Sequence, residues 1–441
     1  MSKTKKSADD IYKKMEHKKH IYTKPDTYVG SCEPEDMDVF SYDQESSMIK
    51  LKKVAYSPAW YKCFDELIVN AHDHKKRMDK VIKDNPKEKH YRVSEIKVTI
   101  LEDNGIVFYN NGDGIHIEYL EKHQMYPVEL IFGALLSSSN FDDSEEREWG
   151  GRNGYGAKLA NIFSKKFIVE TVDHKVKKRL YQEFSDNMNS KTEPVIEDAK
   201  KVKPYTKITW YPDYERFEMD GGAPFLHNII RKRVYDIAGV TDEGTKVYFN
   251  DELIKVKNFE SYAKLYLGEE TTKACVSGPG WDIIATASED DVFQHVSFVN
   301  GIYTSRGGTH VEYIATQIKN ALVTYFKKKR KMAIKPQIAK NQLKIFVNAY
   351  KIVNPVFDSQ TKETLKTTKS KFSTKFTIPQ SFINDLVKTE IVQKILNQSA
   401  FKEIQSMTKT DGRKTKRVKV PKLLDANKAG SKHSKKCTII F

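Results

Sequence analysis

The chain has 441 residues, of which 39% are hydrophobic and 11% aromatic, which excludes a largely disordered protein and predicts roughly two to four domains. Its formal net charge of +16 indicates a polyanionic partner, most simply a nucleic acid. No stretch approaches the roughly 20 apolar residues of a membrane span, so we expect no membrane partner. The 4 cysteines are scattered and lack the spacing of a metal or redox motif, which favours a reducing compartment.

The first half of the chain predicts a basic arm followed by a mixed unit of helices and strands. A helix is expected over residues 57–80, because Pro58 stands at a typical helix start and apolar residues then recur at helical spacing. Residues 185–205 are expected to be a loosely ordered insertion. The other expected elements are strands at 96–101, 106–109, 167–172 and 207–211 and helices over 126–136 and from 159 onward.

A second unit is expected to begin near Gly239. Its end is a basic linker over 408–422, followed by an apolar strand at 437–441. Because a terminal strand would leave its backbone groups unpaired, we expect the sequence to be a fragment cut at the start of a further domain. The expected elements between are strands at 246–249, 281–287, 295–300 and 343–349 and helices over 309–329 and 379–407.

A glycine-rich stretch covers residues 150–158, with the sequence Gly-Gly-Arg-Asn-Gly-Tyr-Gly-Ala-Lys, and runs into a predicted helix. Several of its glycines could adopt positive φ. A loop of this kind at a helix N-terminus presents unpaired N–H groups and the positive end of a dipole, which is typical of a phosphate site. The alternative is an ordinary mobile surface loop, and the motif alone does not decide between the two.

Two further motifs carry candidate ligands. Glu66 and Asn70 lie at i and i+4 of the predicted helix, so they share one face; a carboxylate there could act as a general base, and an amide oxygen suits Mg²⁺. The alternative is a solvated polar stripe. Residues 110–115 read Asn-Asn-Gly-Asp-Gly-Ile, which indicates either a hairpin turn or a strand end where Asn110 reads an adenine edge.

In combination these motifs resemble the ATPase region of the eukaryotic-type DNA topoisomerase II family, part of the GHKL group that includes gyrase and the histidine kinases. The resemblance covers nearly the whole chain, and it is specific because the motifs occur in the family's order. They are Lys-Pro-Asp-Thr-Tyr-Val-Gly-Ser at 24–31, Phe-Asp-Glu-Leu-Ile-Val-Asn-Ala at 64–71, Ser-Ser-Asn at 138–140, the glycine stretch, Phe-Val-Asn-Gly-Ile at 298–302, Gly-Gly-Thr-His-Val at 307–311, Ser-Gln-Thr-Lys-Glu at 359–363 and Lys-Leu-Leu-Asp-Ala-Asn-Lys-Ala-Gly at 422–430.

The resemblance implies an α+β fold and a role for each matching residue. Glu66 would be the general base for ATP hydrolysis, Asn70 the Mg²⁺ ligand, and Asn110 the residue that holds adenine. Lys362 would reach the γ-phosphate from the second unit as a catalytic point charge. The remaining nucleotide contacts implied are Tyr12, Ser138, Ser139, Asn140, Gly151, Arg152, Asn153, Gly154, Tyr155, Gly156, Ala157, Lys158, Gln360 and Thr361.

The family also implies partners. Residues 1–30 would form an arm that crosses to the second subunit of a homodimer when ATP binds, with Tyr12 touching the partner's nucleotide. The basic run Lys327, Lys328, Lys329, Arg330 and Lys331 would contact double-stranded DNA through phosphates, without sequence preference. The alternative for this run is a solvated helix end, where lysines favour the negative end of the dipole.

The implied domains are a GHKL ATP-binding sandwich over 31–240, an α/β transducer over 241–410, and a linker with the first strand of a truncated Toprim domain over 411–441. Such a fragment would hydrolyse ATP but not cleave DNA, in the nucleus of a cell or at a viral replication site. Departures from the family stand at Asp113, His116 and Trp149, beside the adenine pocket and the glycine stretch. Two rivals remain: another GHKL ATPase, such as a chaperone or mismatch-repair enzyme, and a basic nucleic-acid-binding scaffold with a dead nucleotide pocket.

Overall fold

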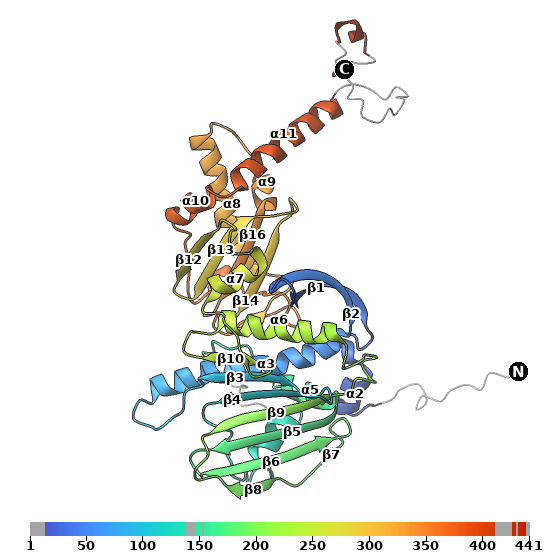
Figure 1. Cartoon of the computed structure of the whole chain (residues 1–441), viewed down its shortest axis with the longest axis vertical. Coiled ribbons are helices and arrows are strands. Elements are labelled where there is room, and N and C mark those ends of the chain that lie inside the picture. Colours follow the sequence, from blue (N-terminus) through green and yellow to red (C-terminus); the bar gives the residue numbers. More distant parts are fainter. Residues whose placement is uncertain (1–13, 138–145, 152–153, 411–425, 429–430, 438–441) are drawn as a thin grey trace, which may run out of the picture.

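The computed structural model describes residues 14–137, 146–151, 154–410, 426–428 and 431–437, and it is α+β as predicted. Two bodies lie one above the other along the long axis of the molecule (Figure 1). The first body is built on a nine-stranded sheet and the second on a five-stranded sheet. No helix of the described residues is both long and apolar enough to cross a membrane.

The nine-stranded sheet has the order β11-β10-β3-β4-β9-β5-β6-β7, with β8 also paired to β6. Helices α3 and α5 pack on one face: Phe64 of α3 contacts Phe108 of β4, and Trp210 of β9 donates to the Ala160 carbonyl of α5. The strands are β3 (Glu95–Ile100), β4 (Ile106–Asn111), β5 (Ser164–Asp173), β6 (Lys178–Ser185), β7 (Ser190–Lys191), β8 (Val195–Asp198), β9 (Tyr205–Pro212), β10 (Lys246–Phe249) and β11 (Glu252–Leu253).

The long helix α3 carries the first functional motif, and its start has a clear local cause. The Ser57 hydroxyl caps it by accepting the Trp60 N–H at 3.2 Å, and Pro58 occupies the first turn. The helices of this body are α2 (His17–Thr23), α3 (Pro58–Asp84), α4 (Pro127–Gly133), α5 (Gly156–Ile162) and α6 (Pro224–Val240), with a short 3-10 turn, η1 (Pro25–Thr27).

A two-stranded hairpin that was not predicted, β1 (Glu35–Asp43) with β2 (Met48–Tyr56), lies between the bodies (Figure 1). Its Tyr42 stacks on Tyr235 of α6 with ring centroids 4.8 Å apart. A small apolar core at the junction includes Tyr42, Tyr262 of α7 (Phe259–Leu267) and Phe298. The two bodies are therefore joined by packed aromatic side chains as well as by the chain itself.

The second body has the sheet order β12-β13-β16-β14-β15, in which β14 and β16 are parallel. Ile314, Ile318 and Leu322 of α8 are fully buried against it, which is the apolar stripe that predicted this helix. The elements are β12 (Ala274–Gly278), β13 (Trp281–Ala287), β14 (Gln294–Val299), β15 (Ile302–Tyr303), α8 (Thr309–Lys329), α9 (Pro336–Asn341), β16 (Leu343–Ala349), η2 (Lys369–Lys371), α10 (Gln380–Leu386), α11 (Ile391–Thr410) and η3 (Ser434–Lys436).

Two sequence-based expectations were wrong. Residues 185–205 are not a loose insertion, because β7 and β8 pair antiparallel with β6. The strand at 246–249 does not belong to the second body, because it pairs in parallel with β3 and extends the first sheet to Leu253. Parallel strands are joined by long connections, so the composition of a strand does not indicate which strand it pairs with. The basic linker and the terminal strand lie mostly outside the described residues; residues 408–410 continue α11.

Candidate active site

A cavity of about 1100 Å³ lies between α3, the end of β4, the start of α5 and the segment 355–362 of the second body. Many of the residues that the sequence motifs singled out line it, although they are spread over almost 300 positions of the chain. They are Glu66, Asn70, Asn110, Gly151, Gly154, Tyr155, Gly156, Ala157, Lys158, Gln360 and Lys362. Thr361 is described beside the wall, whereas Tyr12, Ser138, Ser139, Asn140, Arg152 and Asn153 lie outside the described residues.

Glu66 is held by lysines from both bodies. Its two carboxylate oxygens accept the Lys362 ammonium at 2.8 and 3.1 Å, and Lys62, one turn earlier on α3, lies 2.7 Å away. Burial opposes ionisation, but the attraction of Lys362 and Lys62 is larger and lowers the pKa of Glu66 to about 2. Glu66 is therefore ionised, and it joins the first body to the second.

Asn70 and Asn110 face the same cavity from different elements. Asn70 lies one turn after Glu66 on α3, as the i, i+4 spacing predicted. Asn110 is 7% exposed at the end of β4, and its amide N–H donates to the Asn111 carbonyl at 2.9 Å. The side chain of Asn111 in turn accepts the Ser94 and Glu95 N–H groups. Asn111 thus fixes the strand end, while Asn110 lines the cavity.

The two glycines of the turn after β4 are required by the fold itself. Gly112 has a φ of +111°, a conformation that other residues rarely adopt. A Cβ on Gly114 would lie 1.9 Å from the Val172 carbonyl oxygen of β5. Gly114 therefore allows the turn to approach the neighbouring strand closely.

The glycine stretch is anchored by Asp73, which sequence reasoning missed. Its carboxylate accepts the Gly150 N–H at 3.3 Å and the Gly151 N–H at 3.0 Å. These two N–H groups are thus engaged inside the protein, contrary to the expectation that the loop presents them unpaired. Burial raises the pKa of Asp73 to about 6. Asp73 is seven residues after Glu66, so the helical period alone could have placed it on the same face.

Two other contacts hold the glycine stretch in place. The Lys158 ammonium donates to the Gly154 and Ser137 carbonyls, each at 2.8 Å, and burial lowers its pKa to about 8. A Cβ on Gly156 would lie 2.2 Å from a Glu66 oxygen, so the first residue of α5 sits directly on the carboxylate. In this structure Lys158 thus ties the glycine stretch to Ser137, at the end of the segment after α4.

A second buried ionic connection runs beside Glu66. Arg233 of α6 is fully buried; it donates to Asp65 at 2.7 Å and to the Gly301 carbonyl of the second body at 3.0 Å. The consecutive acidic residues Asp65 and Glu66 are therefore compensated from both bodies. No sequence motif pointed to Arg233, because its partners lie far away along the chain.

The comparisons with known proteins match this geometry. Residues 249–415 match the family model described as DNA gyrase B. DNA topoisomerase 2 of Pisum sativum is 42% identical over 99% of this chain, which spans 29% of that protein's length. The solved ATPase region of Saccharomyces cerevisiae topoisomerase II is 39% identical, with a TM-score of 0.82 over 89% of this chain and 100% of that chain.

The chain belongs to the topoisomerase II ATPase family. The solved ATPase and transducer domains of topoisomerase II from Balamuthia mandrillaris agree, at 37% identity and a TM-score of 0.83 over 90% of this chain and 100% of that chain. The resemblance stated from the sequence motifs is thereby confirmed, and with it the α+β fold.

The basic run of this topoisomerase II relative lies far from the cavity. Lys327, Lys328 and Lys329 form the last turn of α8, and Arg330 and Lys331 follow it, all exposed. The other end of α8 is tied to the segment that carries Lys362, because the Thr309 N–H donates to the Leu365 carbonyl at 3.1 Å. A helix of this length spans about 30 Å, so α8 alone connects the segment that carries Lys362 to the basic run.

Proposed function

We propose that the chain binds ATP with Mg²⁺ in the cavity and hydrolyses it. The observation that carries this proposal is the meeting of Glu66, Asn70 and Lys362, from both bodies, in one large cavity. The first body would be the nucleotide-binding domain, extended to Leu253 by β10 and β11, and the second the transducer. Asn110 would hold the adenine, and the residues of 151–158 and 360–362 the phosphates.

Asn70 fits a magnesium ligand, because its amide lines the cavity one turn from Glu66 and an amide oxygen is a hard ligand. Magnesium, when bound there, would neutralise charge on the phosphates. The residues of the chain would do the rest: Asn70 would orient the ion, and Glu66 would align the attacking water and take its proton. A carboxylate with a pKa near 2 is a weak base, so Glu66 needs a change in its surroundings first.

Lys362 supplies that change. It bonds Glu66 in this structure, and a γ-phosphate would offer it a stronger negative charge in the same cavity. If Lys362 moved to the phosphate, Glu66 would lose its largest stabilising attraction and its pKa would rise toward the ordinary value. The same lysine would then stabilise the charge of the transition state and report the nucleotide state to the second body.

For the whole protein we propose a type II DNA topoisomerase. ATP would close a homodimer through the arm of residues 1–30, with Tyr12 at the partner's nucleotide; residues 1–13 of this arm lie outside the described residues, and residues 14–30 include α2 and η1. The exposed cations 327–331 would contact the phosphates of double-stranded DNA captured between the subunits. The protein would act in the nucleus, or at the site of viral replication if the gene is viral.

The test is the rate of ATP hydrolysis by the purified chain, with and without duplex DNA. We expect Glu66→Ala to bind ATP but to hydrolyse it about 10²- to 10⁴-fold more slowly, the usual contribution of a general base. Glu118→Ala is the matched control, because Glu118 lines the same cavity but is exposed. Unchanged turnover in Glu66→Ala would remove Glu66 as the base, and a wild-type chain without ATPase activity would favour the scaffold alternative.

A further inference from the structure

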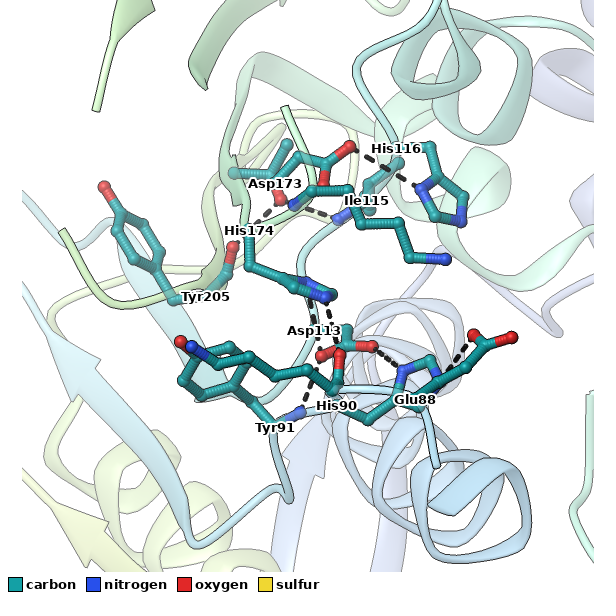
Figure 2. Close-up of polar contacts among 12 residues, drawn as sticks. Glu88, His90, Tyr91, Asp113, Ile115, His116, Asp173, His174 and Tyr205 are labelled. Carbon is teal, nitrogen blue, oxygen red and sulfur yellow. Dashed lines mark hydrogen bonds and ion pairs between the residues drawn. The ribbon is translucent and has the colours of Figure 1, made fainter. Parts of the chain in front are cut away.

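Three side chains with metal-ligating atoms meet at the edge of the cavity, away from Glu66 and Lys362. Asp113, in the turn after β4, lies between the rings of His90 and His174 (Figure 2). Nδ1 of His90 is 2.6 Å from Asp113 Oδ2, and Nδ1 of His174 is 3.4 Å from Asp113 Oδ1. The three side chains are between 7% and 12% exposed, and their ligand atoms all lie within 4.8 Å of one another.

The hydrogen bonds of His174 fix the direction of its lone pair. Its Nε2 lies 3.0 Å from the Lys89 carbonyl, and because a carbonyl only accepts, Nε2 carries the proton. In the neutral ring Nδ1 therefore presents a lone pair to the Asp113 carboxylate. This nitrogen is buried and has no hydrogen-bond partner among the described residues. Two lone pairs that face each other at 3.4 Å repel unless a proton or a metal cation lies between them.

His90 contacts the same carboxylate through a hydrogen bond. Its Nδ1 donates to Asp113 Oδ2 at 2.6 Å, and its Nε2 lies 3.3 Å from the Glu88 carboxylate, so an ion that binds Nδ1 would displace the proton of this bond. The outer nitrogen of His174 thus bonds the Lys89 carbonyl, and that of His90 lies beside the carboxylate of the preceding acidic residue, Glu88. Histidines that bind a metal characteristically donate their other N–H to a carboxylate or carbonyl in this way.

We propose that His90, Asp113 and His174 bind a divalent transition-metal ion such as Zn²⁺. Two imidazole nitrogens and one carboxylate oxygen are a common ligand set for such ions, with water completing the shell. Two ligands at about 2.1 Å from a tetrahedral ion lie about 3.4 Å apart, which is the separation of His174 Nδ1 and Asp113 Oδ1. His90 Nδ1 is hydrogen-bonded to Asp113 Oδ2 at 2.6 Å and would move away from that oxygen to bind the ion. The other lone pair of Asp113 Oδ1 accepts the Tyr91 N–H at 2.8 Å, so the carboxylate is already oriented.

The ion would tie together three segments that are distant in the sequence: the loop before β3, the turn after β4 and the end of β5. His90, Asp113 and Gly114 also line the nucleotide cavity, near Asn110. His74 of α3 already holds the same turn, because its Nε2 donates to the Asp113 carbonyl at 2.9 Å. A bound ion would therefore stiffen the rim of the cavity at the proposed adenine end.

The experiment uses the whole chain without a polyhistidine tag, stripped with a chelator and titrated with Co²⁺ in the absence of nucleotide. We expect one equivalent of Co²⁺ to bind, with the intense visible absorption of a four- or five-coordinate ion, and Zn²⁺ to displace it. His174→Ala should weaken the binding at least 100-fold, and Glu88→Gln about 10-fold, the effect of losing an outer partner. His116→Ala is the matched control, because this neighbouring, 63% exposed histidine pairs with Asp173 instead.

Two results would overturn the proposal. One is a folded wild-type chain that takes up neither ion at micromolar concentration. The other is a His174→Ala variant that binds Co²⁺ as tightly as the wild type, which would place the ion elsewhere, for example at the exposed Cys275. If His174→Ala does not fold by circular dichroism, Asp113→Asn gives the same comparison, because the amide oxygen can still accept the Tyr91 N–H.

Discussion

Two buried carboxylates on helix α3, Glu66 and Asp73, have pKa values shifted in opposite directions. Glu66 has the ammonium groups of Lys62 and Lys362 beside it, and its pKa falls to about 2. Two turns later Asp73 accepts the backbone N–H groups of the glycine stretch. Burial outweighs these bonds and the attraction of Lys362 and Arg77, and it raises the pKa of Asp73 to about 6. Both side chains are at most 4% exposed. Burial is therefore shared, and the charge of the neighbours decides which ionisation state the fold favours.

The two carboxylates therefore have different structural roles along α3. The Glu66 region is an ionic contact between two bodies, which an anionic ligand could break by attracting Lys362. The Asp73 region is a hydrogen-bonded anchor inside the first body, which holds the glycine stretch through two backbone N–H groups. Three substitutions test whether these regions act separately.

The largest effect is expected from Lys362→Met. If Lys362 stabilises the transition state of hydrolysis, kcat should fall by about 10³-fold, the lower range for a cation of this kind in other nucleotide hydrolases. Lys366→Met, four residues later and exposed, is the control and should keep its rate. Steady-state ATPase assays measure both; a Lys362→Met enzyme within threefold of the wild type would leave the ion pair with Glu66 as a structural contact only.

The next effect concerns stability. Glu66→Gln leaves the buried Lys362 without its ion-pair partner and Lys62 with Asp65 at 3.6 Å, so the free energy of unfolding at pH 7 should fall by about 3–5 kcal/mol. The folded pKa of Glu66, about 2, is below its ordinary value of 4.5, so its ionised form stabilises the fold fully above about pH 4.5. This contribution is lost as the pH falls through about 2. Denaturant unfolding of both proteins should therefore show a difference that narrows in acid; a constant difference would contradict the charge argument.

The smallest effect at neutral pH is expected from Asp73→Asn. The free energy of unfolding should fall by about 1–2 kcal/mol, because the loss of a hydrogen-bond acceptor is partly offset by the removal of a buried charge. The contribution of Asp73 to stability should depend on pH in the opposite direction to that of Glu66. The folded pKa of Asp73, about 6, is above its ordinary value of 3.8, so its contribution is present below about pH 3.8 and lost as the pH rises through about 6. The wild type should thus lose up to about 3 kcal/mol relative to Asp73→Asn over this range. Parallel pH profiles for the two variants would refute the comparison.

Much of the fold could be predicted wherever the sequence pattern within a single helix or strand indicates its type and bounds. The apolar stripe of α8 predicted both of its ends, and β16 was predicted at its observed bounds, because helical periodicity and continuous apolar runs are local properties. The hairpin β1–β2 was missed because its strands alternate weakly and their burial comes from aromatic contacts with α6 and α7. The partner of β10 could not be predicted, since parallel pairing is decided by distant residues.

The candidate site shows the same division. Glu66, Asn70, Asn110 and Lys362 were identified from motifs in their correct order, and the structure brings them to one cavity. Asp73, Lys62 and Arg233 were not identified, because a buried charge is recognised only when its partner is known. The cluster of His90, Asp113 and His174 was equally hidden, since its members come from three separate segments.

The sequence by itself determined the family and the α+β class, and it named the candidate site residues that have a motif of their own, because these depend on residue types at fixed spacing. Only the tertiary structure decided how those residues are charged and held: which lysines surround Glu66, which N–H groups Asp73 accepts, and which histidines face Asp113. The physical reason is that pKa and hydrogen bonding depend on distances of a few ångströms, and those distances are set by packing between segments that are far apart in the chain.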